Sequence, residues 1–144
     1  MTPVAGTDYL ETEVMTATPQ RLQLMLIDAA IRSASHARYY LAQQNNQAAL
    51  TPILRAQRIM AELISGLSSD SQDGLVRRVA AVDLFIYRSL IAANLEHSTA
   101  RLDDALRVLD VERETWRRVC ELLGAESHEA AVGTTYSLGT SFEA

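Results

Sequence analysis

Apolar residues cover most of the circumference of one stretch of the chain, from Leu75 to Leu95. If this stretch is helical, one apolar stripe recurs at steps of three and four residues. Its members are Leu75, Val79, Val82, Ile86, Leu90 and Ala93. Further apolar residues flank this stripe or lie behind it. A helix this apolar in a short chain is either enclosed by its neighbours or offers part of its surface to a partner.

The same spacing predicts three more long helices, over about 19–43, 47–67 and 99–124. Polar clusters separate them, and no run of alternating apolar and β-branched residues indicates a strand. Four helices of roughly 20 residues joined by short links form an antiparallel bundle. We therefore predict an all-α protein in which residues 19–124 form one antiparallel four-helix bundle.

The helix boundaries follow from proline and glycine. Pro19 suits the first turn of the first helix, and Gly124 is a stop signal for the last one. The start of the second helix has two interpretations. Either Thr51 caps a helix that begins at Pro52, or the helix begins near Gln47 and the proline removes one early hydrogen bond and bends it.

Two segments outside the bundle have different patterns. Residues 1–18 form an N-terminal cap segment, in which Asp8 and Glu11 have the spacing of a capping box that starts a short helix. That helix would display three apolar side chains, those of Tyr9, Leu10 and Val14. Residues 125–144 are rich in small and polar residues, which predicts a flexible, disordered C-terminal tail.

Composition narrows the class of protein. A chain of 144 residues fits one domain that needs no disulfide or metal to fold. Its net charge of −5, without any basic run, argues against nucleic-acid binding. The single cysteine, Cys120, cannot form an internal bridge, which fits a reducing compartment. No apolar run has the length of a signal-peptide core or a membrane span, so we expect a cytoplasmic protein with no membrane insertion.

Residues with catalytic or ligand chemistry are sparse. A di-iron bundle needs Glu-x-x-His pairs on two helices, and the sequence contains none, so no metal site is expected. No Gly-rich phosphate loop, nucleophile elbow or activated cysteine occurs, which predicts a protein with no cofactor, no catalytic residues and no enzymatic activity. The alternative is a histidine phosphotransfer or signalling bundle that uses His36, although its surroundings, SASHARYY, do not resemble the expected motif.

Two charged residues interrupt the apolar seams of the predicted helices. Asp83 lies among apolar neighbours four residues before Tyr87, and Arg113 breaks the seam of the last helix. A pairing between them, or with Tyr87, would satisfy both charges and fix the register of the bundle. In the other interpretation, both side chains snorkel at helix margins. The sequence leaves this choice open.

Four short segments, taken in order along the chain, match the pattern of one protein family. They are Tyr9 and Val14 ahead of TATPQRLQLMLIDAAIR at 16–32, AQRIMAELISGL at 56–67, YRSLIAANL at 87–95, and ETW at 114–116. In this order and at these separations they resemble the flagellar secretion chaperone FliS family, whose members are cytoplasmic helical bundles. The resemblance spans nearly all of the predicted ordered chain.

The chain departs from the family pattern at three positions. Ile27 and Ala29 stand where the family often has tyrosine and glycine, and Ser89 replaces a common arginine. Ile27 lacks the hydroxyl with which a tyrosine makes a polar contact to a partner. Ala29 keeps close helix packing nearly as well as glycine does.

The resemblance implies an export chaperone. Its client would be the C-terminal segment of flagellin, which is disordered when free and forms helices in apolar grooves of the bundle. Binding would prevent premature polymerisation in the cytoplasm and keep flagellin competent for the flagellar export apparatus. The tyrosine matched by Tyr9 implies a contact with a protein of the export gate, and a co-chaperone is left open. A helical adaptor for another export client is an alternative within this class.

The resemblance also implies which residues contact a partner. The N-terminal segment of the family covers part of the groove when no client is bound, and Tyr9, Leu10 and Val14 would do so here. The candidate groove residues on the first three long helices are Leu22, Met25, Leu26, Ile53, Met60, Phe85, Tyr87 and Ile91. A bundle core uses the same residue types, so the sequence alone does not separate groove from core.

Overall fold

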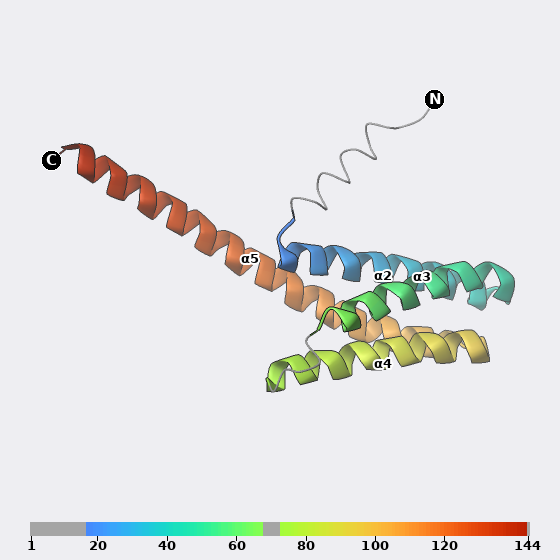
Figure 1. Cartoon of the computed structure of the whole chain (residues 1–144). Coiled ribbons are helices and arrows are strands. Elements are labelled where there is room, and N and C mark those ends of the chain that lie inside the picture. Colours follow the sequence, from blue (N-terminus) through green and yellow to red (C-terminus); the bar gives the residue numbers. More distant parts are fainter. Residues whose placement is uncertain (1–16, 68–72, 144) are drawn as a thin grey trace, which may run out of the picture.

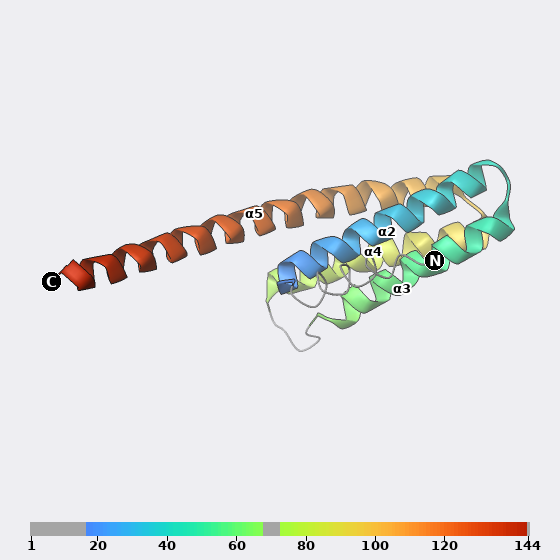
Figure 2. The ribbon, with the colours of Figure 1, turned by 90° about the horizontal axis from the view of Figure 1, so that it is seen from above.

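The computed structural model describes residues 17–67 and 73–143, with side chains described as far as Gly124. Four α-helices occupy nearly all of this part of the chain, namely α2 (Pro19–Ala42), α3 (Asn46–Ser65), α4 (Gly74–Glu96) and α5 (Thr99–Glu143). Consecutive helices run in opposite directions and pack against each other, and α5 closes the bundle against α2 (Figure 1, Figure 2). The predicted all-α, antiparallel four-helix bundle is confirmed.

Polar side chains determine where α2 and α3 begin. Thr18 Oγ1 accepts a hydrogen bond of 3.1 Å from the backbone N–H of Arg21, and Pro19 occupies the first turn, where its missing N–H costs nothing. Asn45 Oδ1 accepts a bond of 3.2 Å from the backbone N–H of Ala48. These caps satisfy backbone donors that the first turn of a helix leaves free.

The start of α3 decides between the two interpretations of Pro52. Because α3 begins at Asn46, Pro52 lies inside the helix, and its side chain is buried. At the other end of the bundle, only His97 and Ser98 join α4 to α5. His97 has a left-handed backbone, with φ of 51°, which turns the chain sharply. The short turn reverses the chain, so that the first part of α5 packs against α4.

The core lies between all four helices. On α2 its residues are mostly small, with Ala30, Ala34 and Ala37 fully buried, and this lets the neighbouring helices approach closely. Larger side chains from the other helices fill the remaining space. The large apolar side chains with almost no exposed surface are Ile27, Ile53, Met60, Ile86, Leu90, Leu102 and Leu109.

The end of the last helix differs from the sequence prediction. We expected a stop at Gly124, but the backbone of α5 stays helical to Glu143. Glycine inside a helix costs only about 1 kcal/mol relative to alanine, and the residues that follow Gly124 include several alanines and glutamates, which favour helix. The final part of α5 extends beyond the bundle (Figure 1). The predicted N-terminal helix lies outside the described residues.

Candidate partner-binding groove

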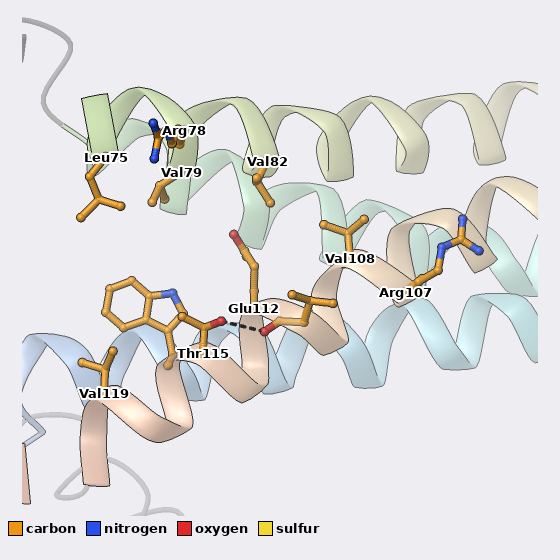
Figure 3. A pocket seen from close by; sticks show the side chains of 11 residues that line it. Leu75, Arg78, Val79, Val82, Arg107, Val108, Glu112, Thr115 and Val119 are labelled. Carbon is orange, nitrogen blue, oxygen red and sulfur yellow. Dashed lines mark hydrogen bonds between the residues drawn. The ribbon is translucent and has the colours of Figure 1, made fainter. Parts of the chain in front are cut away.

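An apolar groove of about 520 Å³ lies between α4 and α5 (Figure 3). The first half of α4 forms one wall and the middle of α5 forms the other. The lining residues are Leu75, Arg78, Val79 and Val82 of α4, with Arg107, Val108, Val111, Glu112, Thr115, Trp116 and Val119 of α5. We call this feature the α4–α5 groove. Its two arginines and one glutamate are the charged groups in an otherwise mostly apolar lining.

The groove exists because the first half of α4 is not enclosed. None of its side chains from Gly74 to Val82 is fully buried, whereas the second half buries Ile86, Leu90 and Ala93. Val82, Val108 and Trp116 pack against the core and line the groove at the same time.

Two apolar side chains at the groove are largely open to solvent. Leu75 is 66% exposed and Val111 is 64% exposed. Apolar side chains left open beside a preformed groove are typical of a surface that binds a partner.

Glu112 is the unusual residue of the groove. Only 9% of it is exposed, and its side chain points from α5 toward α4 (Figure 3). There it meets Asp83 of α4, which has no exposed surface. Both carboxyl oxygens of Asp83 and Oε2 of Glu112 receive no hydrogen bond from any donor group in the described part of the chain. A carboxyl proton between the two acids would supply a donor for these oxygens.

The pKa values of this pair follow from its surroundings. Burial, with the hydrogen bond and the charge of Asp83, raises the pKa of Glu112 from 4.5 to about 9. Burial also raises the pKa of Asp83, although the hydrogen bond from Glu112 lowers it in part. At neutral pH Glu112 therefore keeps its proton, and its carboxyl group can donate a hydrogen bond to Asp83.

Asp83 and Arg113 do not form the pair that the sequence analysis left open. Arg113 Nε donates a hydrogen bond of 2.6 Å to Oδ1 of Asp28 on α2, so it does not pair with Asp83. The seam of α5 is interrupted by an acid, Glu112, rather than by Arg113, which is exposed. Asp83 does not snorkel either, because it is fully buried.

The sequence-predicted groove residues do not lie in the α4–α5 groove. Ile53 and Met60 belong to the core, with 1% and 0% of their surfaces exposed, so they offer no surface to a partner in this conformation. Their helical spacing fits a core and a groove equally well. Tyr9, Leu10 and Val14 lie outside the described residues.

The other predicted groove residues keep some exposed surface. Leu26 and Tyr87 pack partly against the core, and Phe85 is 47% exposed. Leu22, Met25 and Ile91 are half-buried. A role of these six side chains in binding stays a prediction.

The sequence reasoning missed the α5 wall of the groove. A signal was present, because Val108, Val111, Thr115 and Val119 recur at steps of three and four beside the main seam of α5. This second row shows that α5 has apolar residues on more of its surface than the core requires. On α4, Leu75, Val79 and Val82 belong to the predicted apolar stripe, but their spacing does not show which part of that stripe a neighbouring helix covers.

The described part of the chain has no group of three or more metal-ligating side chains close together. Among the described helices, none is long and apolar enough to cross a membrane. His36 is exposed on α2. The molecule is an antiparallel helical bundle with an apolar surface groove. These features are typical of the class of helical bundles that bind a helical segment of a partner.

Comparison with known proteins narrows this class. The sequence model of the family described as flagellar protein FliS matches residues 1–122. The flagellar secretion chaperone FliS of Bacillus subtilis (strain 168) is 25% identical over 122 residues, which cover 85% of this chain and 90% of the relative. That of Escherichia coli (strain K12) is 24% identical over 109 residues, covering 75% and 80%. The chain belongs to the FliS family of flagellar secretion chaperones.

Proposed function

We propose that the protein is a cytoplasmic export chaperone that binds the disordered C-terminal segment of flagellin and delivers it to the flagellar export apparatus. Family membership supports the pathway, since both relatives described above are flagellar secretion chaperones. The α4–α5 groove supports the binding mode. No chemical step is part of this proposal.

The observation that carries the proposal is the apolar groove with open apolar side chains at its edge. An amphipathic helix that lies in it removes the exposed surfaces of Leu75 and Val111 from water. Full burial of one such side chain stabilises a complex by about 1.5–3 kcal/mol. This gain offsets part of the entropy lost when a disordered segment becomes helical.

Binding of this kind explains how a chaperone prevents polymerisation. While the C-terminal segment of flagellin lies on the bundle, its apolar face is not available to other flagellin chains. The half-buried Leu22, Met25, Leu26 and Ile91, with Tyr87 and the exposed Phe85, are candidates for further contacts with the same client. A segment long enough to wrap the bundle reaches them as well as the α4–α5 groove.

The N-terminal segment has two proposed roles. Tyr9, Leu10 and Val14 cover part of the client surface when no client is bound, and they compete with it. Tyr9 also takes part in the contact with a protein of the export gate. Removal of residues 1–16 is then expected to strengthen client binding and to weaken delivery.

Isothermal titration calorimetry of the full chain against the C-terminal segment of flagellin from the same genome tests the proposal. We expect a saturable complex at micromolar concentration or below, with a negative heat-capacity change from apolar burial. No heat of binding at micromolar concentration, confirmed by size-exclusion chromatography of the mixture, would refute it.

A further inference from the structure

The buried acid pair in the α4–α5 groove has no role in the packing of an ordinary bundle. Replacing two core carboxyls by apolar side chains would save the free energy of removing them from water. The two acids lie at one place, on facing helices, and one of them lines the groove. The stability of the bundle therefore does not explain why acids occupy these two positions.

A metal ion does not account for the pair. Calcium takes six to eight oxygen ligands and zinc takes four ligands, and the described residues near Asp83 and Glu112 supply no third ligating side chain. The pair can be neutralised by a proton or by a cation that arrives from outside the chain.

No positively charged side chain of the packed helices neutralises the acid pair in the described structure. Arg113 of α5 is bound instead to Asp28 of α2. From α3, the charged side chains are all exposed; these are Arg55, Arg58 and Glu62. Tyr87, one turn from Asp83 on α4, has no cationic group.

The two arginines of the groove do not neutralise the pair either. Arg107 is bound to Asp104 at 2.6 Å, and neither Arg78 nor Arg107 forms an ion pair with Glu112 in the described structure. Both arginines lie away from the Glu112 carboxyl, near the ends of the groove (Figure 3).

We propose that Glu112 is the receptor for a cationic side chain, lysine or arginine, carried on the otherwise apolar face of the client helix in the α4–α5 groove. This proposal rests on the proposed function and names a feature of its client. The cation reaches the Glu112 carboxylate through the groove and replaces the proton that the pair holds in the free protein. Asp83 lies behind Glu112 and adds its negative charge to the site.

Such a contact fixes the position of the client along the groove. Apolar contacts alone allow a helix to slide by one turn, because Val79, Val82, Val108, Val111 and Val119 offer similar surfaces at each turn. A charge-assisted hydrogen bond at one point allows a single register. A client without the cation covers the acid pair without compensating its negative charge, so the site also discriminates against other apolar helices.

Exchange of the proton for a cation makes binding depend on pH. Each complex formed at neutral pH releases up to one proton, and the affinity rises as the pH rises toward the titration range of the pair. Calorimetry detects the released proton, because the measured heat then depends on the ionisation enthalpy of the buffer.

The test is titration of the full chain with the flagellin C-terminal segment in phosphate and in Tris buffer at the same pH. We expect about 0.5–1 proton released per complex for the wild-type protein. Glu112→Gln should release none and bind about tenfold more weakly, as expected for loss of a charge-assisted hydrogen bond. Asp110→Asn, which removes the same charge at an exposed position of α5, should behave like the wild type.

A second series changes the client. Replacement of each basic residue of the segment by methionine should identify one position at which proton release is lost and wild-type affinity falls. The same replacement should leave the affinity for Glu112→Gln almost unchanged.

The outcomes separate the two proposals. Binding without proton release, or proton release that persists in Glu112→Gln, overturns the cation receptor and leaves the export chaperone standing. Absence of any binding to the wild-type protein overturns both.

Discussion

The carboxyl groups of Asp83 and Glu112 meet across the interface between α4 and α5, and burial beside Asp83 raises the pKa of Glu112 to about 9, so that Glu112 keeps its proton at neutral pH. Asp83 has no exposed surface and Glu112 has 9%. Two ionised carboxylates in contact would repel each other where little water solvates them, so Glu112 keeps its proton in the folded state. The stability of the bundle is therefore linked to pH through this pair.

We predict that the free energy of unfolding falls as the pH rises from about 5 to about 8. In the unfolded chain Glu112 titrates near 4.5, and in the folded protein near 9, so within this window the folded state binds more protons. An acid whose pKa is raised in the folded state therefore contributes most to the free energy of unfolding at low pH, and this contribution is lost as the pH rises. Each pH unit lowers the free energy of unfolding by up to about 1.4 kcal/mol. Urea unfolding across this window measures the slope.

Two variants isolate the contribution of Glu112. Glu112→Gln removes the titrating proton but keeps a donor for Asp83, so its stability should vary less with pH and should exceed that of the wild type at about pH 8. Asp110→Asn is the matched control on the exposed side of α5, and it should retain the wild-type slope. Equal slopes in Glu112→Gln and the wild type would show that the pair does not titrate as described.

Surface ion pairs do not disturb this measurement. Hydrogen bonds from arginines lower the pKa of Asp103, and they lower that of Glu114 to about 2. A lowered pKa of an acid contributes stability that is present above its unfolded value and is lost as the pH falls below it. Those contributions change below about pH 4.5, outside the window used for Glu112.

Val111→Glu should weaken client binding without changing the fold. Val111 lines the groove and is 64% exposed, so a glutamate there costs the bundle little but places a charge on the apolar face of the client. We expect a loss of affinity of about tenfold or more. Leu54→Glu is the control, because Leu54 is 46% exposed on α3, which contributes no residue to the groove. Equal affinities of the two variants would place the binding surface elsewhere.

Met60→Ala should destabilise the protein rather than abolish a contact with the client. Met60 has no exposed surface, and truncation of a buried methionine costs about 2–5 kcal/mol. Phe85→Ala, at a side chain that is 47% exposed, should cost clearly less. Urea unfolding of both variants gives the two values. If Met60→Ala kept the wild-type stability but lost client binding, Met60 would be a client contact rather than a core residue.

Truncation after Gly124 tests the proposed domain organisation, in which residues 19–124 form the bundle and 125–144 a tail. The part of α5 that follows Gly124 extends away from the other helices (Figure 1). Its removal should therefore leave the melting temperature within a few degrees of the full-length value. A large drop in melting temperature would show that the tail is part of the folded unit.

Much of the fold follows from patterns that the sequence displays openly. Helical spacing, the polar clusters between the helices and Pro19 predict four helices in an antiparallel bundle, and the structure has them. The end of α5 was less predictable, because a single glycine inside a run of good helix formers does not stop a helix on its own. The interior position of Pro52 was one of two alternatives, since proline is tolerated in the first turns.

The position of the α4–α5 groove was harder to predict than the fold, for a physical reason. Periodicity tells which residues share one face of a helix, but not which helix covers that face. Met60 and Val79 both belong to apolar stripes, and only the packing shows that Met60 is enclosed while Val79 lines the groove. The partner of Asp83 was missed because two acids are not expected to pair, and the sequence carries no sign of a shared proton.

Fluorescence of Trp116 tests the central claim most directly. It is the single tryptophan of the chain, and it lines the α4–α5 groove. Titration with a tryptophan-free C-terminal segment of flagellin should shift its emission to shorter wavelength as the client removes it from water, with the same midpoint as the heat of binding. Saturable binding in the calorimeter without any change in Trp116 emission would contradict the assignment of this groove as the client site.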